Sequence, residues 1–370
     1  MTALARPSPP RDSAFPALPP GGSAVWGGHD GAPISHAPPS QGGTTGAHRR
    51  LAMSAMVLGT LLLCALPGSV QAAFRLYLSA DGDDARDGRR AATAIRTLSR
   101  ADRLLHRYSP KEEVEILIAP GLYLDQQVRW TYLNGCRISF MPMPDASGRA
   151  VFDGRGDGTW FQLRSGSGAS KLRFRGLTVT RYWLGIDLVG DRDDPGRWNA
   201  DNELDGMHFL RIGNKYPPTG GRYSYAAVRL VNSRSNLIVG NVFEKIENVE
   251  ARSGYVHAIY AAHHSRWNRI ENNAFIDVSG DAIRTRDASN GNRIIGNSFV
   301  RAGKYAAYSD WFCTRNCGLF RHECPSVSNV FRDNRVQDGY HGALAATRAF
   351  GPDDACGAPG QARIIEVRSP

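Results

Sequence analysis

The sequence predicts an all-β fold: a parallel β-helix, or solenoid of stacked coils, with one short helix near its start. Three observations predict this fold. A short asparagine motif recurs along the chain, a strand-like segment follows each copy, and the number of residues between copies varies. A motif that returns every few dozen residues is typical of a solenoid. The chain has 370 residues, of which 42% are hydrophobic, enough to bury a substantial core.

The N-terminal region is not expected to belong to this fold. Residues 1–50 are rich in Pro, Gly and Ser, a composition typical of disordered segments. Residues 51–72, which follow two arginines, have the apolar run and the small-residue cleavage site of a signal peptide. We expect cleavage after Ala72, which leaves residues 73–370 as one β-helix domain. A membrane anchor is the alternative, but the apolar run is shorter than the roughly 20 residues that span a bilayer.

The charge of the chain favours acidic partners. The formal net charge is +10, and residues 1–72 contain four arginines and two aspartates, so the mature part keeps 10 − 2 = +8. Outside the cytoplasm such a charge attracts anionic polysaccharides. No nucleic-acid-binding motif accompanies it. We expect a periplasmic or extracellular monomer that binds an anionic polysaccharide, binds no nucleic acid and is not stably inserted in a membrane after cleavage.

Three segments precede the repeats. The pattern predicts a strand and an acidic turn over Phe74–Gly88, a helix over Ile95–Tyr108, and a strand with a Gly turn over Val114–Tyr123. The carboxylates of the turn belong to Asp81, Asp83, Asp84 and Asp87. Calcium is therefore the one cofactor that the sequence suggests, although the full ligand pattern and its closing glutamate are absent.

The repeat motif has an asparagine at its start, an apolar residue two positions later and a second asparagine at +5. Full copies begin at Asn236, Asn268, Asn292 and Asn329, and fainter copies begin at Leu172 and Asn202; the intervals between the six starts are 30, 34, 32, 24 and 37 residues. Because the intervals vary and the motif does not, loops are inserted between strands that stay in register. Asparagine suits the bend because it tolerates left-handed backbone angles and can hydrogen-bond along a stack of copies.

A second strand follows each motif. These strands begin at Leu184, Ala226, His257, Asp281 and Gly342. Alternate side chains of a strand point to opposite faces. The predicted inward column consists of Ile186, Val228, Ile259, Ile283 and Leu344. A leucine-rich repeat is the competing solenoid, but its leucine frame and its helix-forming segments are missing.

The order of these segments resembles the pectate-lyase-like β-helix superfamily. A strand, an Asp/Gly turn, a short helix and a strand closing in Pro-Gly-x-Tyr precede Val151–Gly154 and the coils. The resemblance covers residues 74 to about 350. It implies a right-handed coil of three sheets, with the helix at Ile95–Tyr108 capping the N-terminal end. It leaves the activity open, because the superfamily includes lyases, hydrolases, epimerases and non-catalytic surface proteins.

The outward positions of the second strands gather titratable and aromatic side chains. Stacking of coils at about 4.8 Å would align Asp187, Arg229, Tyr260, Arg284 and Ser309 in one column. His257 and Asp281 would lie in the next column, and Arg286 and Trp311 in a further one. Such a face could form an extended carbohydrate cleft.

The residue types on this face suit elimination at a uronate. That reaction needs positive charge beside the carboxylate, a base for the C5 proton and an acid at the leaving oxygen. The expected catalytic residues of a lyase or epimerase are His257, Tyr260, Asp281 and Arg284. The expected substrate-binding residues are Arg229, Arg286, Asp310 and Trp311, where an arginine would bind a second carboxylate and the tryptophan would stack on a sugar.

Two alternatives remain open at this stage. The arginines and aspartates could form surface ion pairs on a non-catalytic carbohydrate-binding or structural protein. A glycoside hydrolase would need a carboxylate pair, for which Asp281, Asp287 and Asp310 are candidates, but no hydrolase motif of the superfamily is present.

The cysteines and paired histidines favour structural roles. The mature part contains Cys136, Cys313, Cys317, Cys324 and Cys356. Because five is odd, at least one stays free or pairs outside the chain. We expect a disulfide among Cys313, Cys317 and Cys324 to tie an insertion between two coils; a zinc site with His322 is the alternative. His263 and His264 end a strand and are expected to be loop residues, not metal ligands.

Overall fold

The computed structural model describes residues 72–216, 222–313, 322–351, 355–357 and 360–367. The predicted disordered segment, all but the last residue of the predicted signal peptide, and Cys317 lie outside the described residues. Within the described part, the search for a helix long and apolar enough to cross a membrane finds none.

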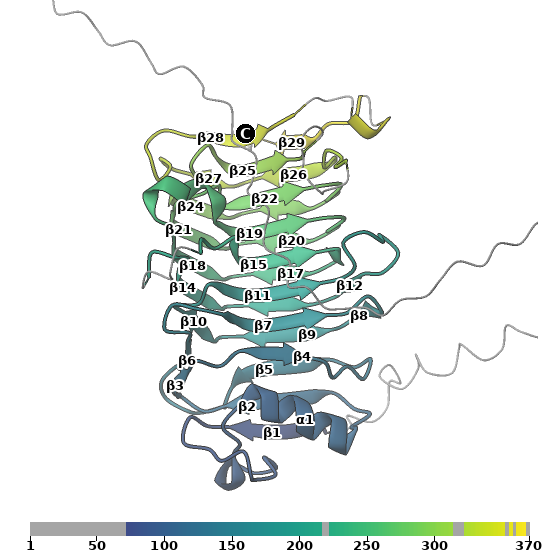
Figure 1. The fold of residues 1–370 in the computed structure, drawn as a ribbon, viewed down its shortest axis with the longest axis vertical. Coiled ribbons are helices and arrows are strands. Elements are labelled where there is room, and N and C mark those ends of the chain that lie inside the picture. Colours follow the sequence, from purple (N-terminus) through teal and green to yellow (C-terminus); the bar gives the residue numbers. More distant parts are fainter. Residues whose placement is uncertain (1–71, 217–221, 314–321, 352–354, 358–359, 368–370) are drawn as a thin grey trace, which may run out of the picture.

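The chain winds into a right-handed parallel β-helix of three long sheets, which confirms the predicted fold (Figure 1). Sheet A contains, in spatial order, β1 (Phe74–Leu78), β2 (Val114–Ile118), β5 (Ile138–Pro142), β9 (Leu172–Arg175), β13 (Glu203–Asp205), β17 (Leu237–Val239), β20 (Arg269–Glu271), β23 (Arg293–Ile295), β26 (Asn329–Arg332) and β29 (Ile364–Val367). Sheet B contains β3 (Gly121–Leu124), β6 (Ala150–Asp153), β10 (Thr178–Thr180), β14 (His208–Ile212), β18 (Val242–Ile246), β21 (Ala274–Val278), β24 (Ser298–Ala302) and β27 (Arg335–Val336).

Sheet C forms the third face. It contains β4 (Val128–Trp130), β7 (Thr159–Arg164), β11 (Leu184–Val189), β15 (Ala226–Val231), β19 (His257–Ala262), β22 (Ile283–Arg286), β25 (Ala306–Trp311) and β28 (Ala345–Ala349). A small fourth sheet pairs β8 (Gly168–Ala169), β12 (Asn199–Ala200) and β16 (Ser233–Arg234). Short 3-10 helices lie at Ala91–Thr93, Glu250–Tyr255 and Ala355–Gly357. A complete coil therefore contributes one strand to each of the three sheets.

The predicted helix is α1 (Leu98–Tyr108), at the N-terminal end of the stack (Figure 1). It begins three residues later than predicted because Thr97 is its N-cap, whose hydroxyl accepts a hydrogen bond from the Arg100 N–H at 3.1 Å. Asp84 of the acidic turn accepts hydrogen bonds from the Thr97 N–H (3.0 Å) and hydroxyl (2.6 Å). The apolar face of α1 is buried in the same core as β1 and β2.

Two asparagine ladders hold the corners on either side of sheet A. In each ladder the side-chain amide of one asparagine donates to the Oδ1 of the asparagine in the next coil, at 2.8–3.0 Å. The ladders consist of Asn202, Asn236, Asn268, Asn292 and Asn329, and of Asn241, Asn273, Asn297 and Asn334. All of these buried amides except that of Asn329, the last of the first ladder, are thereby paired, which removes the cost of desolvating them unpaired.

The sequence suggested that the ladder asparagines themselves make the bend at these corners, and this was wrong. The left-handed residues directly precede them: Asp201, Ser235, Trp267, Gly291 and Ser328 in one corner, and Gly240, Asn272, Gly296 and Asp333 in the other. Because the preceding residue turns the chain, each internal ladder asparagine aims both its backbone N–H and its side-chain amide at the next coil, as at Asn236.

The inward column of sheet C was predicted correctly except at its last position. Ile186, Val228, Ile259 and Ile283 lie in register. The next member is Tyr308 of β25, not Leu344. Leu344 was wrong because it precedes β28, whose inward residue in this column is Thr347. Leu344 instead packs against the core from the loop, half-buried.

Candidate functional site

One column of outward side chains runs along sheet C from β4 to β28. The strand register aligns Arg129, Gln162, Asp187, Arg229, Tyr260, Arg284, Ser309 and Arg348. The five central members are those predicted from the sequence, so their alignment is confirmed. Seven steps of about 4.8 Å make the column roughly 34 Å long.

The arginines in the middle of this face are each held by a buried carboxylate. The pairs are Asp187–Arg229 (2.8 and 2.9 Å), Asp281–Arg284 (2.6 Å) and Glu323–Arg286 (2.7 Å). The three carboxylate side chains are at most 2% exposed, and the arginines 11–27%. We call Arg229, Arg284 and Arg286 the paired arginines; their positions are fixed and most of their charge is balanced within the protein.

Asp281 lies beneath the face and organises it. One carboxylate oxygen accepts hydrogen bonds from the Tyr305 and Ala306 N–H groups at 2.8 and 3.1 Å, and the other binds Arg284. Burial by itself would raise the pKa of Asp281, but Arg284 and the Tyr305 N–H hold that pKa below its ordinary value. Asp281 is therefore an ionised anchor for Arg284, with its acceptor sites in use.

His257 is buried beside this pair. Its Nδ1 donates to the backbone carbonyl of Asp281 at 2.6 Å, which leaves Nε2 as the unprotonated nitrogen of the ring. Burial and the Arg284 charge lower the pKa of His257 to about 3. The imidazole is neutral at physiological pH, and its ring centre lies 5.4 Å from that of Tyr260.

Tyr260 connects the column that contains Arg284 with the further column that contains Arg286 and Trp311. Arg286 Nη1 donates to the Tyr260 hydroxyl at 3.1 Å, and the same guanidinium lies over the Trp311 ring at 4.4 Å. Burial opposes the charge of Arg286, but Tyr260 and Glu323 hold the pKa of Arg286 above its ordinary value. Tyr260 is half-buried, and a phenol that accepts from a guanidinium keeps its own O–H for another acceptor.

Asp310, expected to bind the sugar, lies on the other side of the strand. Alternation along β25 turns Ser309 outward and Asp310 inward, where the side chain is fully buried. Its carboxylate binds Arg363 at 2.9 Å and the Thr285 hydroxyl at 2.8 Å, and burial raises its pKa. Asp310 is therefore a core ion-pair residue and is left out of the site.

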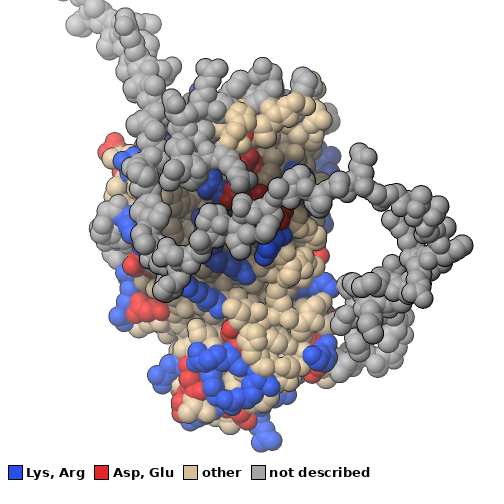
Figure 2. Space-filling view, turned by 45° about the vertical axis from the view of Figure 1, so that its right-hand side comes forward, with Lys and Arg blue, Asp and Glu red and all other residues tan. Residues whose placement is uncertain are grey.

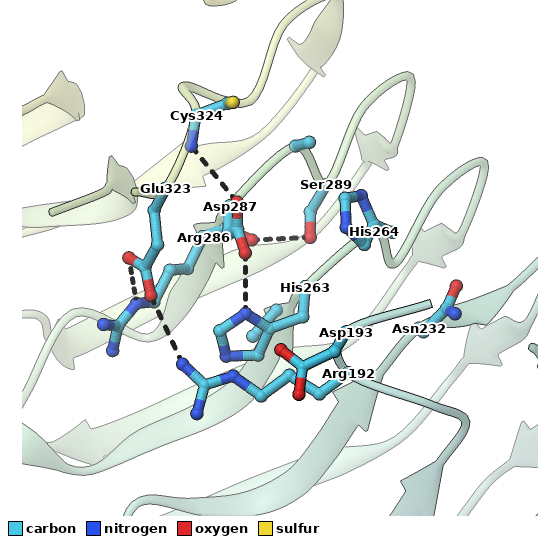
Figure 3. A network of polar contacts seen from close by, with 12 residues as sticks. Arg192, Asp193, Asn232, His263, His264, Arg286, Asp287, Ser289, Glu323 and Cys324 are labelled. Carbon is cyan, nitrogen blue, oxygen red and sulfur yellow. Dashed lines mark hydrogen bonds and ion pairs between the residues drawn. The ribbon is translucent and has the colours of Figure 1, made fainter. Parts of the chain in front are cut away.

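A second polar network lies where β19 and β22 meet the loop that carries Glu323 (Figure 3). His263 Nδ1 donates to Asp287 at 2.8 Å, and the backbone N–H of Cys324 donates to the other oxygen of Asp287 at 3.1 Å. The remaining oxygen of Glu323 lies 3.7 Å from Arg192. The network thus connects the loop to the strands and positions Glu323 against Arg286.

This network includes a set of potential metal ligands. His263, Asp287 and Glu323 each present one ligand atom, all within 4.8 Å of one another. Histidine with two carboxylates could suit zinc. The charges oppose a cation, however, because Arg192 and Arg286 both face Glu323. Burial lowers the pKa of His263, whose neutral ring donates to Asp287. We interpret the network as support for Arg286.

The acidic turn has a structural role as well. Asp83 accepts from the Ala85 N–H at 2.9 Å, Asp84 caps the start of α1, and Asp87 accepts from the Thr93 hydroxyl at 2.6 Å. These carboxylates satisfy local donors, and the suggestion of calcium gains no support from their geometry.

A disulfide is found in the predicted insertion. Cys324 pairs with Cys356, a partner outside the expected trio, and so offers no thiolate to a zinc ion. None of the described cysteines is free, so the expected odd thiol is not among them. Glu323 was missed by the sequence analysis because it lies in the 37-residue interval between motifs. The one sequence feature that could have indicated a role for Glu323 is its position between His322 and Cys324.

No family model matches the sequence, and neither does any curated protein. Among solved structures, the fold is similar to a rhamnogalacturonan lyase with TM-score 0.50 and 13% identity, over 71% of this chain and 68% of that one. It also aligns with an alginate lyase from Paenibacillus sp. str. FPU-7 (0.45, 16%, over 74% and 94%) and pectate lyase Pel9A (0.44, 12%, over 78% and 81%). At these identities the likeness shows the fold alone.

Proposed function

We propose that this chain is an exported protein that binds an anionic polysaccharide along the outward face of sheet C and modifies it by lyase or epimerase chemistry at Tyr260. The observation that carries the proposal is the setting of the Tyr260 phenol. Arg286 donates to it, and Arg229 and Arg284 flank it one coil away on either side.

The reaction follows from the acidity of a uronate. Positive charge beside the sugar carboxylate makes the C5 proton more acidic. In this proposal the Tyr260 oxygen, to which Arg286 donates, is the base that takes this proton; the electron pair forms the C4–C5 double bond as the bond to the leaving oxygen breaks, and that oxygen takes the proton from Tyr260. An epimerase shares the first step and returns a proton to the other face of C5 instead.

The paired arginines keep donors for a substrate. A guanidinium has five N–H groups, and Arg229 uses two of them on Asp187. Arg284 likewise uses Nε on Ser309 and Nη2 on Asp281. The remaining donors can bind a sugar carboxylate while the internal carboxylate fixes the side chain. In this proposal His257 and Asp281 are positioning residues, and Trp311 offers a ring for stacking.

Two other functions are less well supported. A glycoside hydrolase needs a pair of available carboxylates. Asp281 and Asp310 are fully buried and bound to arginines, and Asp287 is bound to His263. A non-catalytic binding or structural protein remains the rival, because the charge on the face is largely balanced within the protein.

The proposal is tested with Tyr260→Phe, which removes only the hydroxyl. Pectate, alginate and glycosaminoglycans are offered to the wild type and to the variant, and absorbance of the unsaturated product, reducing ends and epimer content are measured. Loss of the general acid–base group should lower turnover by about two orders of magnitude or more. Tyr108→Phe, on α1, is the matched control and should retain full turnover.

Arg284→Ala would be a poorer test. It leaves the Asp281 carboxylate buried without its cation, so loss of turnover and loss of folding would coincide. Activity unchanged in Tyr260→Phe would refute the role of the phenol. Reducing ends without ultraviolet absorbance would favour a hydrolase, and binding without any reaction would favour a scaffold.

Export is part of the same proposal. The disulfide Cys324–Cys356 suits an oxidising compartment. Cleavage after Ala72 would leave β1, which begins at Phe74, whole. N-terminal sequencing of the mature protein should therefore start at Ala73. Recovery of the uncleaved chain from membranes would support an anchor instead.

A further inference from the structure

We propose a second binding site for the same polysaccharide in a groove at the N-terminal end of sheet C. This N-terminal groove would take an acidic group of the bound chain, a carboxylate or a sulfate ester, four coils away from Tyr260. The inference rests on the proposed function, because it extends the same outward column.

The groove has a volume of about 550 Å³. Its lining includes Arg103 of α1, Arg129 of β4, Gln162 of β7, Trp183 and Arg222. β4 is the edge strand of sheet C. Beyond it, α1 occupies the place where a further coil would otherwise extend the outward face of this sheet. The groove is therefore the end of the outward face.

The charge of the groove is available to a ligand. Arg103 and Arg129 are exposed, and neither side chain forms an ion pair or a hydrogen bond with the described residues. Asp102 also lines the groove, but its carboxylate is occupied by the N–H groups of Thr131 and Tyr132 at 3.0 and 2.9 Å. Figure 2, with the N-terminal coils at the bottom, shows Lys and Arg side chains gathered at this end.

The lining contains three arginines and two aspartates, so it carries an excess of positive charge. The second aspartate, Asp157, is exposed and accepts a hydrogen bond from the Gly158 N–H at 2.7 Å. An anionic ligand would therefore meet two arginines, Arg103 and Arg129, whose guanidinium groups form no ion pair with a carboxylate of the described residues. Such a setting favours charge-assisted hydrogen bonds to carboxylate or sulfate.

An aromatic wall accompanies the charge. The Trp183 indole N–H donates to the Tyr223 carbonyl at 3.0 Å, and Arg222 lies over the indole at 4.9 Å. Tyr225 packs edge-on against the same ring at 5.6 Å. The ring is thus fixed in place at the groove, where it can contact the apolar face of a sugar. Charge beside a fixed aromatic ring suits an acidic sugar better than a free small anion.

The groove is continuous with the proposed reaction site. Gln162 lies in the same outward column as Arg129 and donates to Asp187 at 2.8 Å. From Arg129 to Tyr260 the column makes four steps of about 4.8 Å, or roughly 19 Å. A bound chain of several sugar units would therefore reach from one to the other.

The test is calorimetric binding, which needs no turnover. Eight-unit oligosaccharides of galacturonate, alginate and heparin are titrated into the wild type, Arg103→Ala/Arg129→Ala, Trp311→Ala and a control. The control is Arg293→Ala/Arg335→Ala, which removes two exposed arginines from sheets A and B. We expect the groove variant to weaken binding tenfold or more and the control at most threefold. Comparing the affinity for the galacturonate oligosaccharide with that for the heparin oligosaccharide shows whether the groove prefers a carboxylate or a sulfate ester.

The outcomes separate the two proposals. If the groove variant binds like the control while Trp311→Ala binds poorly, the groove site is refuted and the proposed function stands. If binding depends on Arg103 and Arg129 but not on Trp311, the groove stands and the stacking role of Trp311 is refuted, while the role of Tyr260 is still decided by the turnover of Tyr260→Phe. If the wild type binds none of the three oligosaccharides, both fall.

Discussion

The middle of the sheet C face and the N-terminal groove are both rich in arginine, but they hold it differently. In the middle, Arg284 and its neighbours are fixed by buried carboxylates. In the groove, Arg103 and Arg129 extend into solvent without any ion-pair partner among the described residues. Counting arginines would treat the two regions as equal. The pairing shows that the middle provides fixed geometry with little net charge, and that the groove provides net charge with little fixed geometry.

This contrast also predicts how each region responds to change. Removing one partner of a buried ion pair leaves the other charge uncompensated in a poorly solvated place. Removing an exposed, unpaired side chain changes little beyond its hydration. Stability should therefore depend on the middle, and attraction of anions on the groove.

The largest effect is expected at Asp281. Asp281→Ala removes the anion bound to Arg284 and leaves the Tyr305 and Ala306 N–H groups without their acceptor. The free energy of unfolding should fall by about 3–5 kcal/mol, measured by denaturant unfolding at pH 7. Asp338→Ala, at an exposed position with ordinary backbone angles, serves as the control. A loss below about 1 kcal/mol would mean that the pair does not hold the face together.

A smaller effect is expected from pH at His257. Its pKa of about 3 in the folded protein lies below the ordinary value of 6.5, so the unfolded chain binds the proton first as the pH falls. The stability that neutral His257 contributes is full above pH 6.5 and is lost progressively between pH 6.5 and 3. Between pH 6 and 4 this amounts to about 1 kcal/mol per pH unit.

The measurement compares the unfolding free energy of wild type and His257→Gln at pH 7 and pH 5. Burial also lowers the pKa of His263 and His264, so only the difference between the two proteins isolates His257. The variant should lose less stability on acidification. His106→Gln, an exposed position on α1, should follow the wild type. Parallel pH profiles for wild type and His257→Gln would show that the imidazole is not buried as described.

The smallest effect on stability is expected in the groove. Arg103→Ala/Arg129→Ala should change the free energy of unfolding by less than about 0.5 kcal/mol, because neither side chain has an ion-pair or hydrogen-bond partner in the described part of the chain. Denaturant unfolding at low and high salt checks this. A clear loss of stability would mean that the groove arginines are structural after all, and the contrast with the middle of the face would disappear.

The fold could be predicted because the corners allow few residues. Each internal ladder asparagine must supply a donor and an acceptor to neighbouring coils, and glycine or another residue that tolerates left-handed angles must precede it. These demands repeat in every coil, so they are visible as a motif. A similar ladder runs through serines, in which the backbone N–H groups of Ser233, Ser265 and Ser289 donate to the hydroxyls of Ser265, Ser289 and Ser326, but serine is too common to be recognised this way.

The candidate site could be predicted only as far as register follows from the motif. Counting from Asn268 and Asn292 aligns Tyr260 with Arg284 correctly. The same register places Ser309 outward and therefore Asp310 inward, so the expectation that Asp310 binds the sugar did not agree with the register and was wrong. Glu323 could not be found at all, since a long loop brings it to Arg286.

The N-terminal groove could not be predicted from a sequence pattern. Its three arginines come from α1, from β4 and from the segment before β15, and Trp183 precedes β11. No spacing relates these positions, because the capping helix and the inserted loops pack against the coils through tertiary contacts. Only the register of β4 with β7 connects Arg129 to the predicted column.

The ladder has a consequence for the evolution and engineering of such chains. A coil meets its neighbours through the same asparagine and strand bonds wherever it stands, so whole coils can be added or removed with little change to the rest. Each coil inserted between β4 and β19 would move Arg129 and Tyr260 apart by one increment of about 4.8 Å. The number of coils would then set the distance between the groove and Tyr260, and with it the length of polymer needed to occupy both sites.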